Sequence, residues 1–344
     1  LDRSSAALDV YKRQLPGDPA RMMLGQNENQ KELQLIQKKY GFDQPIYIQY
    51  LNYLNDLSPI SAHPHQHDFN GLSTQQYTYI NLLNVGDRAV VLKLPYFRES
   101  YYRTGVKVSQ VIRNTLPNTA ILAITALLIA ISFGLFFGIL SAIYSNSNLD
   151  RVIQLVSTLG MSLPSFFSAI LVAWIFGFLL HQYTSLDMTG SLYALDDMGE
   201  SYRIVWKNLI LPAFVLGIRP LAVVSQLIRN ALLDEWNRGY VKTARAKGLS
   251  TSTIILKHML KNALNPVITA LSGWFASMLA GAVFVEYIFG WNGIGKEIVN
   301  ALNFLDIPVL MGSVITVSFF FIIINQVVDL LYAYLDPKVQ LNKH

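Results

Sequence analysis

The sequence predicts an all-α, polytopic membrane protein: a helical bundle of five transmembrane helices, preceded by an extracytoplasmic domain. Its 344 residues are 52% hydrophobic and only 14% charged, a balance too apolar for an ordinary soluble domain. Five stretches are each long and apolar enough to cross a bilayer, which takes about 20 residues of helix. They run roughly over 120–144, 152–180, 208–228, 266–289 and 309–334.

The chain divides into four regions on this pattern. Residues 1–14 are polar and mixed in charge and join abruptly to Leu15-Pro16-Gly17, so we expect them to be a non-native scar in place of an apolar first helix. The other regions are an extracytoplasmic region at 15–115, a transmembrane domain at 116–336 with a cytosolic loop at 229–265, and a cytosolic tail at 337–344.

The extracytoplasmic region has weak local signals. We expect short helices over 30–40 and 45–57, a strand over 85–93, and the start of a helix toward the membrane between 105 and 114. No alternation of apolar and polar residues is strong enough to predict a sheet.

The second and third spans contain proline. Pro164 lies in the second span, and Pro212 and Pro220 lie in the third. Membrane helices tolerate proline, because neighbouring helices and side chains satisfy the freed backbone groups. We therefore expect each span to remain one helix.

The charges of the short loops set the orientation. The loops at 145–151 and 229–265 and the tail carry ten Lys and Arg, whereas the loops at 181–207 and 290–308 carry three. The first group is cytosolic by the positive-inside rule. Trp206 and Trp291 then fall where an outer aromatic belt is expected.

Several function classes are excluded. There is no cysteine, which removes disulfides and thiol chemistry. The Walker A, HExxH and GxSxG patterns are absent, so the chain has no motif for ATP binding, metalloprotease or serine hydrolase chemistry. The net charge of +5 gathers on one side of the membrane and does not indicate nucleic-acid binding. No cofactor is predicted.

The cytosolic loop at 229–265 is the most organised polar segment. It has seven Lys and Arg against Asp234 and Glu235. Helix formers run from 231 to 247, Gly248 suits a helix end at positive φ, and Ser250 offers an N-cap oxygen. Small residues such as Ala244 and Ala246 would let a partner surface approach closely. The alternative is a solvated loop whose charge only sets the topology.

Several segments resemble the permease subunit of the dipeptide and oligopeptide ABC importers. The resemblance extends from Leu15 to Leu341. It rests on the order and spacing of these pieces: 16–19 (PGDP), 100–101 (SY), 104–105 (TG), 160–166 (GMSLPSF), 240–249 (YVKTARAKGL), 261–264 (KNAL) with Pro266, 285–286 (VE) with Phe289, Gly293 and Gly295, 329–333 (DLLYA) and 336–337 (DP).

The general motif of ABC importer permeases is E-A-A, three residues, G, nine residues, I-x-L-P. With Gly248 as the frame, Lys242-Thr243-Ala244 stand where E-A-A would stand. The departure is similar to that of the peptide-importer branch, and it weakens the transfer of any role that depends on the missing Glu.

The resemblance implies six family helices, of which the first is missing here, in the bacterial inner membrane. It implies a pathway for short peptides formed with a homologous second permease, an extracytoplasmic binding protein that delivers substrate, and two ABC ATPase subunits docked on the 230–262 loop. It implies no enzymatic activity in this chain. The coupling residues would be Tyr240, Lys242, Thr243, Ala244, Arg245, Ala246, Lys247, Gly248 and Leu249.

A few other polar residues are candidates for function. Arg219 is near the middle of a span, where charge is costly; it could attract a peptide carboxylate, serve an interior ion pair or reach water in the cavity. Glu286 could line the pathway or pair with a neighbouring base. His63, His65 and His67 could bind Ni²⁺, although a polar loop is the commoner outcome. A nickel importer permease is therefore one alternative function, and an ATP-independent secondary transporter is another.

Overall fold

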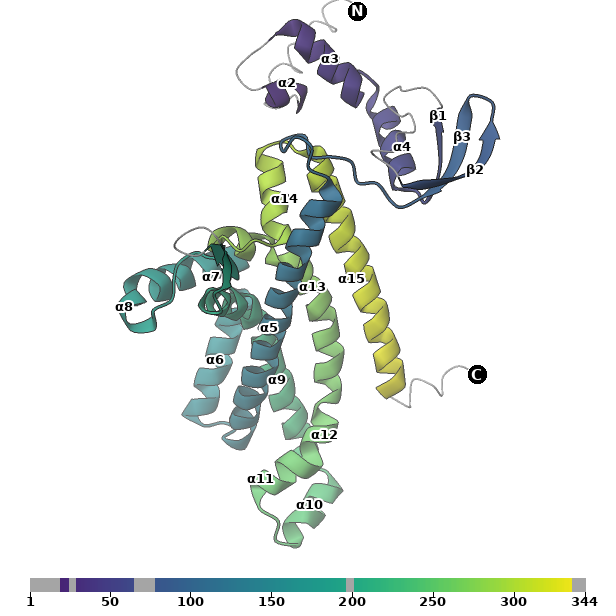
Figure 1. The fold of residues 1–344 in the computed structure, drawn as a ribbon. Helices are drawn as coiled ribbons and strands as arrows, with labels where there is room; N and C mark the ends of the chain where they lie inside the picture. The colour runs from purple at the N-terminus through teal and green to yellow at the C-terminus, as the bar shows by residue number, and fades with distance from the viewer. Residues whose placement is uncertain (1–18, 25–28, 65–77, 196–200, 336–344) are drawn as a thin grey trace, which may run out of the picture. The chain divides into compact units, whose positions relative to one another are not determined.

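The computed structural model describes residues 19–24, 29–64, 78–195 and 201–335, which are mostly helical (Figure 1). They divide into two compact units. Unit 1 joins the residues up to Asn114 with Glu297–Val314, and unit 2 joins Thr115–Lys296 with the residues from Ile315 onward. The sequence analysis had assigned 297–314 to the transmembrane domain. The predicted scar at 1–14 lies outside the described residues.

Unit 1 begins with helices and continues with a sheet. The helices predicted at 30–40 and 45–57 are confirmed as α3 (Gln30–Tyr40) and α4 (Ile46–Leu57), and the short α2 (Pro19–Leu24) precedes them. The strands are β1 (Ile60–Pro64), β2 (Tyr79–Val85) and β3 (Arg88–Lys93). They form an antiparallel sheet in the order β1-β3-β2, which the weak alternation in the sequence did not predict.

The strand predicted over 85–93 is wrong in its boundaries. Val85 ends β2 and Arg88 begins β3, with Gly86 at a φ of +60° in the turn between them. A residue at positive φ ends an extended strand, so the stretch forms a hairpin instead of one strand. Ala89 and Val91 of β3 are fully buried.

Two buried carboxylates hold the loops of unit 1. Asp56 at the end of α4 forms an ion pair with Arg98, at 2.7 Å between Oδ2 and Nε. Asp306 accepts hydrogen bonds from the hydroxyl of Ser100 and, at 3.0 Å, from the backbone N–H of Tyr101. The pairing of 100–101 with residue 306 explains why the structure groups 297–314 with the N-terminal region.

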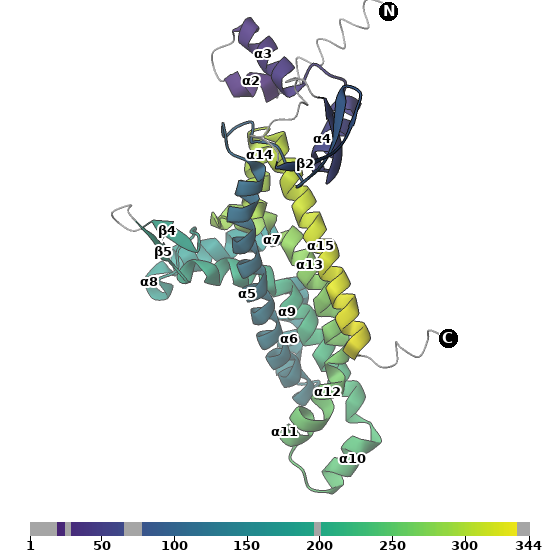
Figure 2. The ribbon, with the colours of Figure 1, turned by 45° about the vertical axis from the view of Figure 1, so that its right-hand side comes forward.

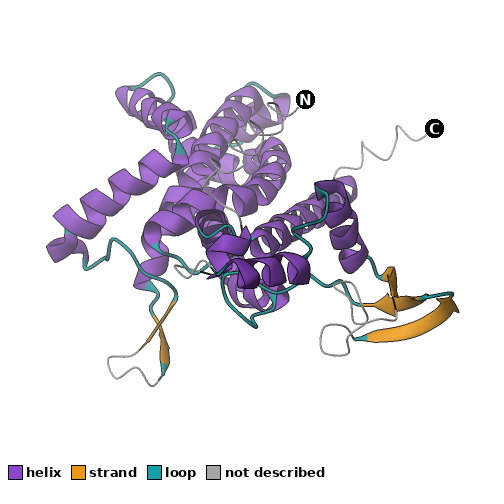
Figure 3. Cartoon of the chain, turned by 90° about the horizontal axis from the view of Figure 1, so that it is seen from above, coloured by secondary structure: helices purple, strands orange, loops and turns teal. Residues whose placement is uncertain are grey.

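Most of each long helix belongs to unit 2 (Figure 2). The chain forms these elements: α5 (Val108–Ile143), α6 (Asn148–Ser162), α7 (Ser165–Val172), η1 (Ala173–Leu179, a π-helix), α8 (His181–Thr184), β4 (Tyr193–Leu195), β5 (Tyr202–Ile204), α9 (Lys207–Trp236), α13 (Asn265–Phe289), α14 (Ile294–Asn303) and α15 (Ile307–Leu335). Strands β4 and β5 form a second small sheet, separate from the first (Figure 3). The fold is therefore predominantly helical, and its two sheets correct the all-α prediction.

Three helices within the described residues are long and apolar enough to cross a membrane. They are α5, α9 and the Ile307–Val327 part of α15. Helix α6 with α7 and η1 makes a fourth span if the bent pair is counted as one. Several side chains of α13 lie outside the described set, and the count of five spans stays a prediction.

The second predicted span is not a continuous helix. The chain bends by 112° between Ser162 and Ser165. Leu163 is extended at a ψ of 134°, as a residue before proline tends to be, and Pro164 has no N–H to continue the helix. The expectation of one uninterrupted span across Pro164 is therefore wrong, whereas α9 does run through Pro212 and Pro220.

Helix α9 is the centre of unit 2 and packs against α6, α7 and α13. It also approaches α5 closely: a Cβ on Gly138 would lie 2.6 Å from the carbonyl oxygen of Ser225, and one on Gly134 would lie 2.7 Å from Val224. Small residues at this spacing allow membrane helices to meet backbone to backbone.

Trp291 does not belong to an outer aromatic belt. Its side chain is fully buried in the core of unit 2, and its indole Nε1 donates to the carbonyl of Asn118 at 3.0 Å. Trp206 is exposed, as the sequence analysis expected. A tryptophan with a buried hydrogen-bond acceptor packs as a core residue.

Candidate functional site

The basic loop between α9 and α13 is folded, and its helices lie at one end of unit 2, beyond the ends of α9 and α13 (Figure 1). It consists of α10 (Gly239–Ala246), α11 (Thr251–Thr253), the π-helical η2 (Ile254–Met259) and α12 (Leu260–Ala263). The helix-forming run from 231 to 247 is interrupted at 237–238, where α9 ends and α10 begins.

Gly248 makes the turn after α10. Its φ is +75°, its N–H donates to the carbonyl of Arg245 at 2.9 Å, and the N–H of Leu249 donates to the carbonyl of Ala244 at 3.3 Å. These are the two hydrogen bonds of a Schellman helix end. Ser250 Oγ then accepts a hydrogen bond from a backbone N–H of α11. The predicted turn and N-cap are confirmed.

The inner side of the loop is a small apolar core. Six of its side chains are buried, and they pack in one cluster with Ile228 and Leu232 of α9: Val241, Ala244, Ile254, Ile255, Met259 and Ala263. Ala244 therefore faces this core and is not available to a partner, which corrects the expectation drawn from its size. Ala246 is exposed. The core joins the loop to the end of α9.

The outer side of the loop carries its charge. We call the following exposed residues the basic face: Lys242, Arg245, Lys247, Lys257 and Lys261. Thr243 and Gly248 are exposed beside them, and so are Leu249 and Leu256, whose exposures are 40% and 60%. The guanidinium of Arg245 lies over the ring of Trp236, 4.3 Å from its centroid. The loop thus exposes both apolar and cationic groups.

A polar link fastens α10 to its neighbours. The hydroxyl of Tyr240 donates to Glu235 at the end of α9, and Asn262 of α12 donates to the Tyr240 hydroxyl at 3.4 Å. Partial burial and the hydrogen bond to Glu235 raise the pKa of Tyr240 above its ordinary value. Tyr240 therefore serves the internal structure of the loop.

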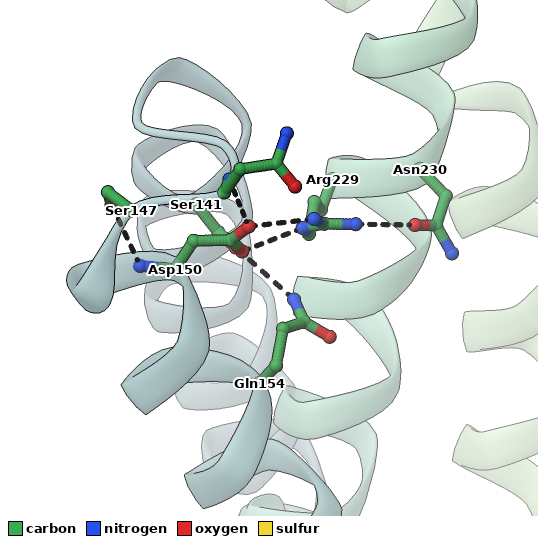
Figure 4. A network of polar contacts seen from close by, with 7 residues as sticks. Ser141, Ser147, Asp150, Gln154, Arg229 and Asn230 are labelled. Atoms are coloured by element: carbon green, nitrogen blue, oxygen red, sulfur yellow. Dashed lines mark hydrogen bonds and ion pairs between the residues drawn. The ribbon is translucent and has the colours of Figure 1, made fainter.

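A buried ion pair lies where α5, α6 and α9 meet (Figure 4). Arg229 of α9 binds the Asp150 carboxylate with two hydrogen bonds, from Nε to Oδ1 at 2.8 Å and from Nη2 to Oδ2 at 2.7 Å. The Asp150 side chain is 4% exposed and that of Arg229 is 19% exposed. Ser141 at the end of α5 donates its hydroxyl to Asp150, and the N–H of Asn146 donates at 2.8 Å.

This group, which we call the Asp150 clamp, fixes three helix ends at once. Asp150 lies in the first turn of α6, where the partial positive charge of a helix N-terminus favours a carboxylate. Two parallel hydrogen bonds between guanidinium and carboxylate also fix their relative orientation. Arg229 is therefore part of the bundle and not only a charge of the loop; its partner Asp150 is 79 residues away along the chain, so no local pattern indicates the pair.

Arg219 lies in the middle of α9, partly buried, beside the break between α6 and α7. Its Nη2 donates to the carbonyl of Leu163 at 3.2 Å, and its Nε is buried without a hydrogen-bond partner. Leu163 is the extended residue before Pro164, so its carbonyl has left the helical pattern. Of the roles expected for Arg219, the interior ion pair is absent among the described residues.

Glu286 is fully buried near the end of α13 and serves the start of α14. Its Oε2 accepts from the N–H of Gly295 at 2.7 Å and of Lys296 at 3.2 Å. A Cβ on Gly293 would lie 2.4 Å from the carboxylate, which explains the glycine there. Among the described residues the carboxylate pairs with these backbone amides and not with a neighbouring base, and a place on the pathway stays a prediction.

The histidine tract is only partly described. His63 is buried in β1, with its Nε2 3.0 Å from the hydroxyl of Ser61, whereas His65 and His67 lie outside the described residues. Within the part of the chain that the structure describes, no three carboxylate or imidazole side chains are grouped to hold a metal ion. His63 acts as a core residue of unit 1.

Two protein-family models match this chain. The model of the family "binding-protein-dependent transport system inner membrane component" matches residues 134–341, which include the whole loop. The model for the N-terminal part of such membrane components matches residues 7–67 and so begins within the segment 1–14.

Individual proteins agree with the family match. The chain is 34% identical over 346 residues to the probable D,D-dipeptide transport system permease protein DdpB of Escherichia coli K12, covering 96% of this chain and 91% of that protein. It is 30% identical over 339 residues to the dipeptide transport system permease protein DppB of Alkalihalophilus pseudofirmus, covering 95% and 91%.

A solved structure shares the fold. An inward-facing structure of the MetNI methionine ABC transporter has a chain that aligns with a TM-score of 0.52 at 15% identity, covering 66% of this chain and 97% of that one. At this identity the likeness concerns the fold alone.

Proposed function

Because the chain belongs to the family of binding-protein-dependent transport system inner membrane components, we propose that it is a permease subunit of an ATP-binding-cassette importer of short peptides. The names of its relatives support the peptide substrate. The chain itself is not an enzyme in this proposal, since ATP hydrolysis belongs to partner subunits. It acts in the bacterial inner membrane.

The two faces of the loop at 230–262 carry the proposal of ATPase coupling. The buried core of Val241, Ile255 and Met259 holds the loop to α9, and the basic face with Leu249 and Leu256 is left for a partner. A purely solvated loop would not need a buried core, a Schellman turn and an N-cap. We propose that one ATPase subunit docks here, and that a second docks on the equivalent loop of a homologous permease.

The contacts of the loop and of α9 support a route by which movement of the ATPases reaches the helical bundle. ATP binding closes the ATPases and displaces the loop, whose core moves with the end of α9. The Asp150 clamp then transmits the displacement from α9 to α5 and α6. We propose that this motion switches the pathway between inward-facing and outward-facing states, with an extracytoplasmic binding protein supplying the peptide.

Five spans complete the proposal: α5, the α6–α7–η1 pair, α9, α13 and α15. Helix α13 has 25 residues, enough to cross the bilayer, and it packs against α9. The orientation from loop charges puts the basic face on the cytosolic side, where ATPases act.

The experiment is peptide uptake in proteoliposomes that contain the chain, a homologous permease and two ATPase subunits. We expect uptake of a labelled dipeptide to require both internal ATP and the binding protein. Uptake without ATP would identify a secondary transporter instead. Uptake of Ni²⁺ that an excess of di- to pentapeptides does not reduce would overturn the peptide assignment.

A further inference from the structure

Arg219 is a cation without an anion in the interior of a membrane-spanning helix. Its one hydrogen bond goes to the carbonyl of Leu163, and its Nε is buried with no partner. No carboxylate among the described residues lies within ion-pair distance of it. Charged groups at this depth are costly and are usually paired or placed along a water-filled path. The contrast with Arg229, whose carboxylate partner is in place, shows that α9 can pair an arginine when structure alone requires it.

Three polar residues lie along one line of α9 that begins at Arg219, with the apolar Val223 among them. Arg219, Val223, Gln226 and Asn230 succeed one another at intervals of four, three and four residues, so they share a face of the helix. All four are partly or fully exposed within this chain. A polar line on an otherwise apolar membrane helix avoids lipid and marks the side that faces water or a partner subunit. Arg219 is the end of this line farthest from the cytosolic loop.

The break in the neighbouring span lies at the same level. Leu163, whose carbonyl binds Arg219, is the residue at which α6 stops before the 112° bend. Transporters commonly build substrate sites where a membrane helix is broken, because backbone groups there are not used up by the helix. The guanidinium is therefore held at a discontinuity, with N–H groups in excess of the single carbonyl that it satisfies.

We propose that Arg219 binds the C-terminal carboxylate of the transported peptide. The inference rests on the proposed function and adds the group of the substrate that this chain recognises. A guanidinium matches a carboxylate with two parallel hydrogen bonds, and it repels the ammonium at the other end of the peptide. The peptide would thus enter the path at this level with a fixed polarity, and the charge of Arg219 would be compensated only while substrate is present.

The test compares two forms of one peptide in the reconstituted importer: a dipeptide with a free carboxylate and the same dipeptide as its C-terminal amide. Both are supplied with binding protein at saturation, and the ratio of their uptake rates is measured for the wild type and for Arg219→Gln. Any preference of the binding protein for one peptide form is the same with the wild type and with the variant. A change in the ratio of acid to amide uptake therefore reports on this chain. Arg151→Gln, an exposed arginine of α6, is the matched control.

We expect Arg219→Gln to lower the acid-to-amide ratio about tenfold, the size of a lost charge-assisted pair. We expect Arg219→Lys to keep an intermediate ratio, and Arg151→Gln to keep that of the wild type. Because Arg219→Lys retains the charge, it also serves if the Gln variant fails to insert. An equal decrease in the uptake rates of both peptides in the Arg219 variants would overturn the inference. Arg219 would then have only a structural role, its hydrogen bond to the carbonyl of Leu163. Absence of uptake of either peptide by the wild type would instead overturn the proposed function.

Discussion

The basic face and the Asp150 clamp use charge in opposite ways, although both belong to the end of unit 2 where α9 and the loop meet. The five cations of the basic face are exposed, and so are two leucines of the same loop. The clamp pairs one cation with one buried anion. The carboxylate also accepts hydrogen bonds from α5 and from the turn that follows it. Exposed charge can select a partner, whereas buried charge fixes helices to one another.

The difference predicts two separable defects. A change in the clamp should weaken the bundle and the transmission of movement while leaving the docking surface intact. A change on the loop should weaken association with the ATPase while leaving the bundle intact.

The largest effect is expected for Asp150→Ala. It leaves Arg229 buried without its anion and should destabilise the bundle by about 3–5 kcal/mol. Thermal unfolding of the purified complex in detergent measures the loss. The neighbouring, exposed Arg151→Ala is the control and should change stability little.

A double variant sharpens that result. Asp150→Ala with Arg229→Ala removes both charges, so its loss of stability should be smaller than the sum of the two single losses. ATPase subunits should still copurify with the double variant, while peptide uptake per ATP hydrolysed falls. Additive single effects, or loss of ATPase association, would remove the distinction between clamp and loop.

The second effect concerns the turn of the loop. A valine Cβ at Gly248 meets no atom within 4 Å, so only its φ of +75° opposes the change. A β-branched residue in this region costs on the order of 1–2 kcal/mol, and the loop should be displaced while the bundle stays folded. We expect Gly248→Val to lower ATPase copurification and peptide-stimulated hydrolysis.

Gly239 provides the matched control for the turn. Its added Cβ also meets nothing within 4 Å, but its φ is not in the positive region. Gly239→Val should therefore associate with the ATPase nearly as the wild type does. Equal defects in the two variants would mean that bulk on the loop surface matters, and the turn geometry would not be the cause.

A smaller effect is expected on the basic face itself. Lys247→Glu reverses one exposed charge, and exposed pairs contribute at most about 1 kcal/mol. The defect in ATPase binding should be clear at low salt and shrink as salt is raised, because screening removes it. Arg151 is also an exposed cation but lies outside the loop, so Arg151→Glu should show no salt-dependent defect in ATPase binding. A defect in Lys247→Glu that salt leaves unchanged would contradict an electrostatic role.

What could be predicted from the sequence follows the range of each interaction. Gly248 and Ser250 have local roles, since a helix end and an N-cap involve residues within a few positions, and both predictions hold. The five apolar stretches also correspond closely to helices. Pro164 was seen, but its consequence depends on whether neighbours restore the helix, and composition does not determine that.

The missed features all depend on residues far apart. Nothing near Asp150 indicates Arg229, and nothing near Asp306 indicates Ser100, since these pairs form only when separate helices or loops come together. Trp291 was assigned to the membrane surface by its position at the end of a span, yet its indole has a buried partner in Asn118. Glu286 was treated as a membrane charge, although Gly293 and Gly295 nearby leave room for it to bind backbone amides.

The smallest effect is expected for Tyr240→Phe, which tests the internal link of the loop against its outer surface. The change removes only the hydroxyl that donates to Glu235 and accepts from Asn262. Because the side chain is 39% exposed, the loss should be near the lower end for a hydrogen bond, about 0.5 kcal/mol. Tyr240 is protonated in this contact, and its pKa is raised in the folded loop by partial burial and by Glu235. A group whose pKa is higher in the folded than in the unfolded state stabilises the fold. This stabilisation is complete below the pKa of the unfolded state, about 10 for tyrosine, and is lost as the pH rises through the pKa of the folded state. The stability difference between wild type and Tyr240→Phe should therefore be constant from about pH 7 to about pH 9 and shrink above about pH 10. Protection of the α10 amides from hydrogen exchange, followed over this range, measures it. A difference that grows toward high pH would show that the hydroxyl does not act as the donor.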